Sequence, residues 1–149
     1  MSNGAVEVRR ARAGDAEQLW PLVQDFATSF RPERSAFDRT FTEVLERVDT
    51  LVLVAVSDVG TVVGYLLGSY HGTFFANGSV ACIEELMVSE SVRRRGVASM
   101  LMSSAEEWAR SIPSAYVSLA SRRARDFYLR NGYEDSATFF RKVLAASER

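Results

Sequence analysis

The chain has 149 residues, 47% of them hydrophobic, which is enough for one domain with a substantial apolar core. Its net charge of −1 gives no general attraction to nucleic acid or to an anionic membrane. A single cysteine excludes a disulfide within the chain.

The beginning of the chain predicts neither export nor a membrane anchor. Its first ten residues lack the apolar run of a signal peptide, and no stretch approaches the ~20 apolar residues that cross a bilayer. We therefore expect a cytoplasmic protein with one domain over 1–149 and an ordered core over 6–144. One cysteine and one histidine, His71, are too few for the usual zinc sites, so we predict no metal, although a site of carboxylates alone stays open.

Segments in which apolar residues have strand spacing alternate along the chain with segments in which they have helix spacing. This predicts a mixed α/β protein. The predicted elements of the first half are a strand over 6–11, a helix over 13–23, a loop over 29–37, a helix over 38–48 and strands over 50–58 and 61–70. Those of the second half are a loop over 71–79, a strand over 80–89, a helix from 97 to about 112, a strand over 115–120, a helix over 122–132 and a strand over 133–144. Pro21 should kink or restart the first helix.

The order of these elements indicates how the sheet is connected. The strands on either side of Val59 and Gly60 should form a hairpin. Strand, helix, strand and helix between 80 and 132 predict a parallel crossover, flanked by antiparallel hairpins. Two apolar stripes should face the core: Phe41, Val44, Leu45 and Val48 on one helix, and Val97, Leu101, Ser104, Trp108 and Ile112 on another.

Three consecutive arginines, Arg93 to Arg95, stand where the helix after residue 96 begins. Free N–H groups and the helix dipole make that end attractive to anions, so each exposed cation there costs about 0.3 to 1 kcal/mol. A bound polyanion would explain them, because amides around Gly96 and Ala98 can cradle phosphate oxygens while the arginines clamp them. The alternative is a solvated loop in which the arginines pair with Glu90 or other acids. Neither of two common phosphate motifs, G-x-x-x-x-G-K-[ST] and G-x-G-x-x-G, is present.

The segment IEELMVSESVRRRGVASMLM resembles motif A of the GNAT acyl-CoA N-acyltransferase superfamily, [QR]-x-x-G-x-[GA] after a strand that ends in valine. Arg93, Gly96 and Ala98 fill the motif positions. Downstream, ARDFYLRNGY is similar to the family segment A-x-x-F-Y-x-x-x-G-[FY], whose positions are filled by Ala124, Phe127, Tyr128, Gly132 and Tyr133. The resemblance covers nearly the whole chain. It implies a mixed, mostly antiparallel sheet with a splayed parallel strand pair and about four flanking helices.

The resemblance also implies acetyl-CoA as the cofactor. Met87 and Val88 would offer main-chain groups to its pantetheine arm, and the Val88 amide would polarise the thioester carbonyl in the manner of an oxyanion hole. The pyrophosphate would be held by amides of the following turn and helix, namely Arg94, Arg95, Gly96, Val97, Ala98 and Ser99. The side chains of Arg93, Arg94 and Arg95 would add contacts to the pyrophosphate or to the 3′-phosphate. Ser121 stands where many members have an asparagine that contacts pantetheine.

Two carboxylates within an apolar strand, Glu84 and Glu85, are the candidates for the base, because such groups are costly to bury unless they serve a wet cleft or a partner. Strand alternation directs them to opposite faces unless a β-bulge resets the register. The family position for a carboxylate, four residues before the terminal valine, favours Glu84. Tyr128 matches the family's general acid, and Ala124 beside it leaves room for the thiol arm. Phe127 and Tyr128 could otherwise be ordinary core aromatics.

Three aromatic residues, Phe30, Phe74 and Phe75, lie in the two loops that cover the acceptor in the family, and could wall that site. The sequence does not identify the acceptor amine. Eight basic against three acidic residues between Arg93 and Arg130 make +5 and leave −6 elsewhere, which leans toward a cationic amine without selecting one.

Three function classes follow. The sequence favours an acetyl-CoA-dependent N-acetyltransferase in which a primary amine of a small molecule or peptide attacks directly within a ternary complex. The alternatives are a non-catalytic acyl-CoA-binding module of the same fold, and a nucleic-acid binder that uses the basic segment. We predict no nucleic-acid partner, and family analogy suggests a homodimer through edge strands near the C-terminus.

Overall fold

The computed structural model describes residues 4–145, and the ends of the predicted domain, 1–3 and 146–149, lie outside them. In chain order the elements are β1 (Glu7–Arg10), the 3₁₀ turn η1 (Ala13–Asp15), α1 (Ala16–Phe26), α2 (Arg34–Glu46), β2 (Thr50–Val56), β3 (Val62–Thr73), β4 (Gly78–Val88), the 3₁₀ turn η2 (Glu90–Val92), α3 (Val97–Ser111), β5 (Val117–Leu119) and α4 (Arg125–Arg130). The strands form one sheet in the order β1-β2-β3-β4-β5. Neighbours are antiparallel except for the parallel pair β4 and β5.

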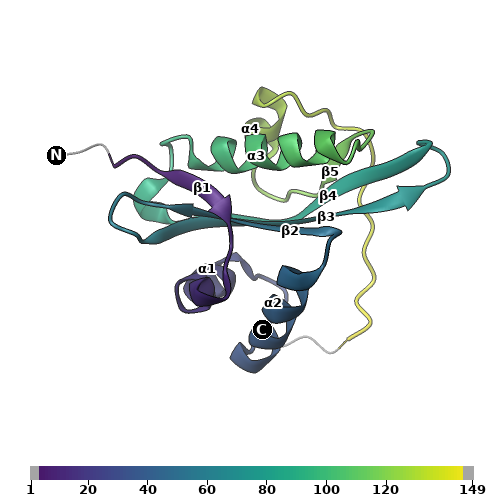
Figure 1. Ribbon diagram of the computed structural model, residues 1–149. Coiled ribbons are helices and arrows are strands. Elements are labelled where there is room, and N and C mark those ends of the chain that lie inside the picture. Colours follow the sequence, from purple (N-terminus) through teal and green to yellow (C-terminus); the bar gives the residue numbers. More distant parts are fainter. Residues whose placement is uncertain (1–3, 146–149) are drawn as a thin grey trace.

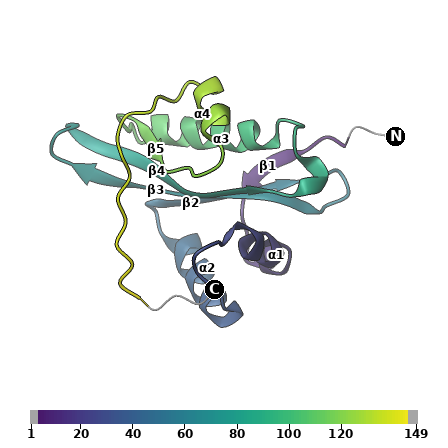
Figure 2. The same cartoon turned by 180° about the vertical axis from the view of Figure 1, so that it is seen from behind.

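The sheet separates two helical layers, with α1 and α2 on one face and α3 and α4 on the other (Figures 1 and 2). Apolar residues of one side of each strand, such as Leu66 and Ile83, pack with Leu101 and Met102 of α3. Residues of the other side, such as Val54, pack with helices α1 and α2 in a second core cluster. The predicted mixed, mostly antiparallel sheet with four flanking helices, and the parallel crossover within it, are confirmed.

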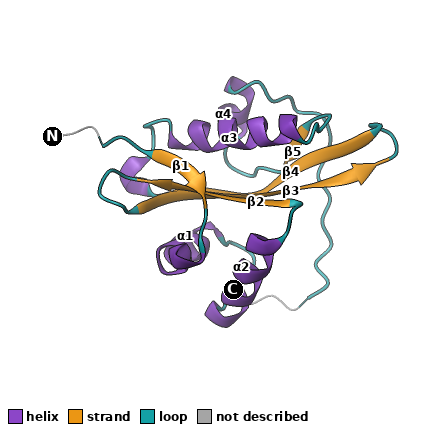
Figure 3. Cartoon of the chain, viewed as in Figure 1, coloured by secondary structure: helices purple, strands orange, loops and turns teal. Residues whose placement is uncertain are grey.

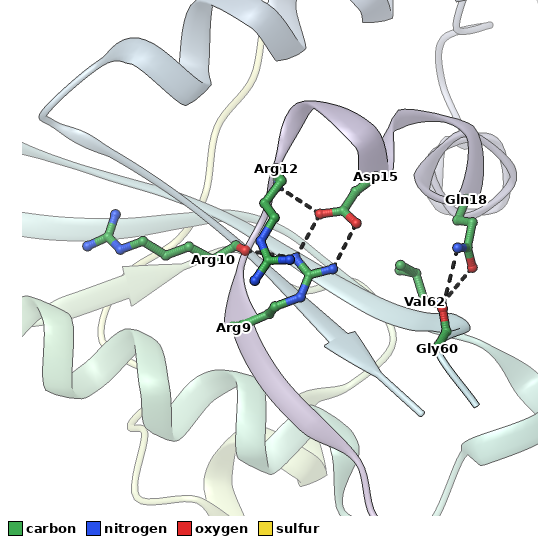
Figure 4. Close-up of polar contacts among 7 residues, drawn as sticks. All are labelled: Arg9, Arg10, Arg12, Asp15, Gln18, Gly60 and Val62. Carbon is green, nitrogen blue, oxygen red and sulfur yellow. Dashed lines mark hydrogen bonds and ion pairs between the residues drawn. The ribbon is translucent and has the colours of Figure 1, made fainter. Parts of the chain in front are cut away.

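Polar contacts tie α1 to the strands beside it (Figure 4). The Arg9 guanidinium on β1 donates to both carboxylate oxygens of Asp15 at 2.9 Å, and the Arg12 amide donates to Asp15 at 2.7 Å. Gln18 accepts a hydrogen bond from the Val62 amide at 2.8 Å. Asp15 is 7% exposed, so these bonds satisfy a nearly buried charge, and the Arg9 contact lowers the pKa of its carboxyl.

The structure changes two predictions about the first helices. Helix α1 does not restart at Pro21 but continues through it. The missing proline N–H costs one bond to the carbonyl of Glu17, which is an exposed residue that water can reach. Helix α2 begins at Arg34 instead of 38, because Arg34 joins Glu17 and Asp38 in ion pairs that favour an earlier start. Val48 lies beyond this helix and is 87% exposed.

Two predicted boundaries in the second half also differ. The loop over 71–79 is shorter, because β3 and β4 extend to Thr73 and Gly78 and leave a four-residue connection. The strand over 115–120 is reduced to β5, which is half-buried. Leu101 of α3 is buried as predicted, whereas Met102, Ala105 and Ala109 rather than Ser104 and Ile112 complete its buried face.

The strand predicted over 133–144 is wrong, since the described residues after Gly132 form no strand (Figure 3). The segment leaves α4, crosses the β5 edge of the sheet and reaches the side of α2 (Figures 1 and 2). Arg125 pairs with Asp135 at 3.1 Å, and Arg141 donates to Ser29 at 3.2 Å, so polar contacts hold it along this path. A three-residue β5 is too short to pair with a strand of that length.

Candidate active site

Strand β4 changes its surroundings half-way along its length. From Ala81 to Ile83 it pairs with both β3 and β5, and its pairing with β5 ends at Ile83 and Leu119. Pairing with β3 continues as far as Val88. Within the described sheet, the edge of β4 over 84–88 that faces away from β3 is therefore open. The two parallel strands separate there, as the resemblance to GNAT proteins implied.

A β-bulge lies at the point where β5 leaves. Leu67 of β3 pairs with Glu85 and Gly68 pairs with Ile83, so Glu84 is the extra residue. Gly68 allows β3 and β4 to approach closely beside the bulge, because a Cβ there would lie 3.1 Å from Ile83 Cδ1 and 3.2 Å from the Cys82 carbonyl oxygen. The bulge resets the side-chain alternation of the strand.

Both carboxylates lie on the face of the sheet that carries α1 and α2. Glu85 accepts a hydrogen bond from the hydroxyl of Tyr65 at 2.6 Å, and Tyr65 belongs to the core cluster under those helices. Glu84 accepts from the thiol of Cys82 at 3.4 Å, and Cys82 points away from the face of its neighbour Ile83. The bulge that the sequence left as an alternative is therefore present, and it brings the two carboxylates to one face.

The two carboxylates differ in environment. Glu84 is exposed, whereas Glu85 is half-buried. Burial raises the pKa of Glu85, the charge of Glu84 raises it further, and the hydrogen bond from Tyr65 opposes both. A carboxyl with a raised pKa is better matched to accepting a proton near neutral pH. Burial also raises the pKa of the Cys82 thiol, which makes it a poor nucleophile.

The turn after β4 is exposed and contains two residues with left-handed backbone. Arg94 and Gly96 have φ of 68° and 79°, both left-handed, and Gly96 is the N-cap of α3. Gly96 has no side chain to occupy the free amides of the first helical turn. Val97 is buried in the core and anchors the helix, while residues 93–96 are exposed. Successive amides in such a turn, joined to a helix N-terminus, form a site for a phosphate group.

One of the three arginines has side-chain partners in the structure. Arg93 donates through Nε to the Val88 carbonyl at 3.2 Å and through Nη1 to Glu90 at 3.5 Å. The Arg93–Glu90 pair is the alternative that the sequence left open, and such an exposed pair contributes little to stability. The bond to Val88 links the turn to the end of β4.

That bond also reveals the direction of the backbone. The Val88 carbonyl meets Arg93, whereas the next amide, that of Ser89, donates to the carbonyl of Val63 in β3 at 2.8 Å. Along an antiparallel strand the direction of the main-chain groups alternates, so those of Val88 and Leu86 point to the open edge and those of Met87 point to β3. The expected main-chain contact from Val88 is compatible with this direction. Met87, by contrast, directs its main-chain groups to β3, and Leu86 directs its own to the open edge.

Helix α4 meets the beginning of α3. The Ser99 hydroxyl donates to Asn131, the C-cap of α4, at 3.3 Å, and Gly132 follows with a φ of 88°. Asn131 and Gly132 thus end the helix as predicted. The Ser121 hydroxyl accepts a hydrogen bond from the Ala124 amide at 3.0 Å, which closes the turn before α4.

Tyr128 of α4 is half-buried against the core cluster that contains Val97 and Leu101. Its ring makes edge contacts with Phe127 at 5.0 Å and with Tyr133 at 5.7 Å between centroids. Burial raises the pKa of its hydroxyl, so the phenol keeps its proton at neutral pH. Tyr128 lies on the α3 and α4 face and Glu85 on the opposite one, with the open edge of β4 between the two faces.

The three aromatic loop residues lie apart from one another. Phe30 is in the α1–α2 loop, on the face of the carboxylates, and is 46% exposed. Phe74 and Phe75 form the tip of the β3–β4 hairpin, 104% and 74% exposed. Six strand residues separate that tip from Glu84, or roughly 20 Å. The position of Phe74 and Phe75 at the hairpin tip therefore does not support their predicted place in the acceptor wall.

A shallow pocket between η1, α1 and α2 is lined by apolar residues such as Phe41 and Leu45 and by the carboxylates of Asp38 and Glu46. It includes no residue of β4, α3 or α4. Among the described residues, no group of three or more histidine, cysteine or acidic residues could hold a metal ion, and no helix is long and apolar enough to cross a membrane.

Sequence reasoning missed Tyr65, Gly68 and Leu86. A tyrosine within the aliphatic run of β3 was a usable signal for Tyr65, because a buried phenol needs a hydrogen-bond partner. Gly68 and Leu86 act through backbone geometry, and the register that assigns their positions depends on the bulge.

Comparison with known families gives one match, in which the model of the acetyltransferase (GNAT) family covers residues 16–133. No curated protein matches the sequence.

Solved structures of similar fold cover almost the whole chain. A transcriptional regulator from Bacillus halodurans C-125 is 23% identical with a TM-score of 0.85, over 94% of this chain and 100% of that one. Glucosamine-6-phosphate N-acetyltransferase from Arabidopsis thaliana is 17% identical with a TM-score of 0.84, over 95% and 99%. Aminoglycoside N-acetyltransferase AAC(6')-Iy, solved in complex with CoA, is 19% identical with a TM-score of 0.80, over 94% and 96%. The TM-scores establish a common fold, and at identities this low they establish the fold alone.

Proposed function

The chain belongs to the acetyltransferase (GNAT) family, whose members use acetyl-CoA, and on that premise we propose that it acetylates a primary amine of a small molecule or peptide. The observation that carries this proposal is the open edge of β4 leading directly into a turn of exposed amides at the N-terminus of α3. This combination of features suits an extended arm that ends in a pyrophosphate, because the strand edge can bond to the arm and the helix N-terminus to the phosphates.

The residues of this chain fit the cofactor. The amides from Arg94 to Ser99 would hold the pyrophosphate, and Val88 would direct its amide to the acyl end of the arm. Arg93, Arg94 and Arg95 border the turn and would add charge-assisted contacts to the phosphates. Ser121 and Ala124 lie at the start of α4, where Ala124 leaves space next to Tyr128. Acetyl-CoA supplies a thioester whose acyl group is open to attack by an amine.

Proton acceptance is assigned to the pair of carboxylates on the opposite face. Most primary amines are protonated at neutral pH, so the acceptor nitrogen must lose a proton before it can attack. Glu84 and Glu85 both face this side of the open edge. Either carboxylate could receive the proton directly or through one water molecule.

Proton donation is assigned to Tyr128. Its hydroxyl is half-buried and keeps its proton at neutral pH. Its place on the other face of the open edge allows it to donate from Oη toward the side that the cofactor sulfur would occupy. Acid and base on opposite faces support direct attack by the amine within a ternary complex, because neither group blocks the other.

The test combines binding with turnover. Thermal unfolding is measured with coenzyme A, for which a concentration of 100 times Kd should add about 2.7 kcal/mol of stability. Acetylation is then measured over a panel of polyamines, amino sugars and peptide amines. Tyr128→Phe should lower kcat by about ten-fold or more while coenzyme A binding is retained. Tyr116→Phe, an exposed tyrosine outside this site, is the matched control and should keep wild-type kcat.

Two results would contradict the proposal. Binding of coenzyme A without turnover on any amine indicates a non-catalytic acyl-CoA-binding module. Salt-dependent binding of RNA or DNA without any response to coenzyme A indicates a nucleic-acid binder.

A further inference from the structure

Tyr65 on β3 is a buried phenol whose hydroxyl is hydrogen-bonded to a carboxylate. The side chain is 3% exposed and lies in the core cluster under α1 and α2. Its hydroxyl donates to Glu85 Oε1 at 2.6 Å, in the short range of hydrogen bonds from a hydroxyl to an ionised carboxylate. Because the phenol is packed in the core, this bond fixes the position of the Glu85 carboxylate.

Glu84 has no comparable support. It is exposed, it occupies the extra position of the bulge, and its contact is the Cys82 thiol at 3.4 Å, a weak donor. A side chain held in this way keeps much of its rotamer freedom. The bulge therefore gives two neighbouring carboxylates on one face, one fixed and half-buried and the other mobile and in water.

We infer that Tyr65 is a positioning residue whose hydroxyl holds Glu85, rather than Glu84, as the carboxylate that accepts the proton of the attacking amine. The inference rests on the proposed function and deepens it. The family resemblance favoured Glu84, so the structure reverses that preference.

Few other charges influence Glu85. Helix α1 packs over β3 and β4, and its ionisable residues Glu17 and Asp25 are exposed, with Glu17 engaged by Arg34. On β4 itself the neighbouring groups are Glu84 and the Cys82 thiol, and on β3 the group is Tyr65. The protonation of Glu85 is thus controlled by burial, by the negative charge of Glu84 and by the donor from Tyr65, which act in known directions.

These directions give opposite effects for two substitutions. Removing the hydroxyl in Tyr65→Phe takes a donor from the charged form of Glu85, so the acidic limb of the kcat/KM profile should move to higher pH by about one unit. Removing the neighbouring charge in Glu84→Gln should move the same limb to lower pH, because that charge raises the pKa of Glu85. Both profiles are measured with the best amine of the panel.

Tyr70→Phe is the matched control. Tyr70 lies on the same strand, but its ring packs against Trp108 of α3, on the opposite face, 5.7 Å between centroids. This variant loses a phenol hydroxyl from β3 without touching Glu85, so its pH profile should coincide with that of the wild type. Thermal unfolding of all variants separates a change in protonation from a loss of folded protein.

Several outcomes would overturn the inference. An unmoved acidic limb in Tyr65→Phe, while the wild type turns over, refutes the role of Tyr65 and leaves the proposed function standing. A loss of about ten-fold or more in plateau kcat in Glu84→Gln identifies Glu84 as the base. If Tyr65→Phe does not fold, the direction of the shift in Glu84→Gln decides, and a shift to higher pH contradicts the assignment. Absence of turnover in the wild type removes the proposed function and the inference together.

Discussion

The two halves of β4 perform different tasks on one strand. The half from Gly78 to Ile83 pairs with β3 and, from Ala81 onward, also with β5. It places Val80, Ala81 and Ile83 in the core, each 5% exposed or less. The half from Glu84 to Val88 has one strand partner, and its residues are half-buried or exposed. A single extra residue, Glu84, separates the two halves.

This difference shows how a sheet can contain a site without losing its stability. A strand with both edges paired has its backbone groups satisfied and cannot bind a ligand through them. Releasing one edge exposes those groups, and the bulge turns polar side chains toward the opening at the same point. The pairing with β3, which continues to Val88, keeps the released half in place.

We call the half of β4 from Gly78 to Ile83 the upper half and that from Glu84 to Val88 the lower half. The largest expected effect on stability concerns the upper half. Ile83→Ala removes a buried side chain that is 5% exposed and leaves a cavity beside α3. The free energy of unfolding should fall by about 2 to 5 kcal/mol, as measured by urea denaturation. Coenzyme A affinity of the folded fraction should be unchanged. A large loss of affinity would mean that the two halves do not divide their tasks in this way.

A smaller effect on stability, with a large one on turnover, is expected in the lower half. Glu85→Gln should lower kcat by about ten-fold or more, which corresponds to about 1.4 kcal/mol. Because Glu85 has a raised pKa in the folded state, its stabilising contribution is complete below the unfolded pKa and is lost as the pH rises through the folded one.

The glutamine does not titrate, so the variant should gain stability relative to the wild type as the pH rises from the ordinary pKa of a glutamic acid through the raised pKa of Glu85. Urea denaturation at several pH values measures this gain. If the free energy of unfolding of the variant instead falls relative to that of the wild type as the pH rises, Glu85 is stabilised in its charged form.

The smallest effect on stability is expected in the turn. Arg93→Gln removes an exposed pair with Glu90 and a bond to Val88, so the free energy of unfolding should change by no more than about 0.5 kcal/mol. Coenzyme A affinity should weaken, by up to about ten-fold at low salt, because an exposed cation next to the phosphates is lost. Unchanged affinity at low salt would assign Arg93 to the loop alone.

The sequence predicted most of the fold because the relevant signals are local. The hairpin at Val59 and Gly60, the parallel crossover after β4 and the C-cap at Asn131 and Gly132 each follow from spacing or turn chemistry in a short window. The segment over 133–144 has strand-like residues, but a strand also needs an edge of matching length. No local pattern reveals that β5 has three residues.

The candidate site was predicted less completely, for a similar reason. The motif positions from Arg93 to Ala98 form the expected turn, since a glycine with positive φ and a helix start are visible in the sequence. The faces of Glu84 and Glu85 depended on a bulge, which arises from the register between β3 and β4. Tyr65 lies twenty residues from Glu85 and meets it only through that register.

The central claim is that the lower half of β4 and the turn at Gly96 bind the cofactor while the upper half does not. It is tested most directly by titrating the ¹⁵N-labelled protein with coenzyme A and following its backbone amide resonances. The account predicts the largest shifts at Val88 and from Gly96 to Ser99, with much smaller ones at Val80 and Ala81. Shifts gathered in the pocket between α1 and α2, or no shifts at saturating coenzyme A, would contradict it.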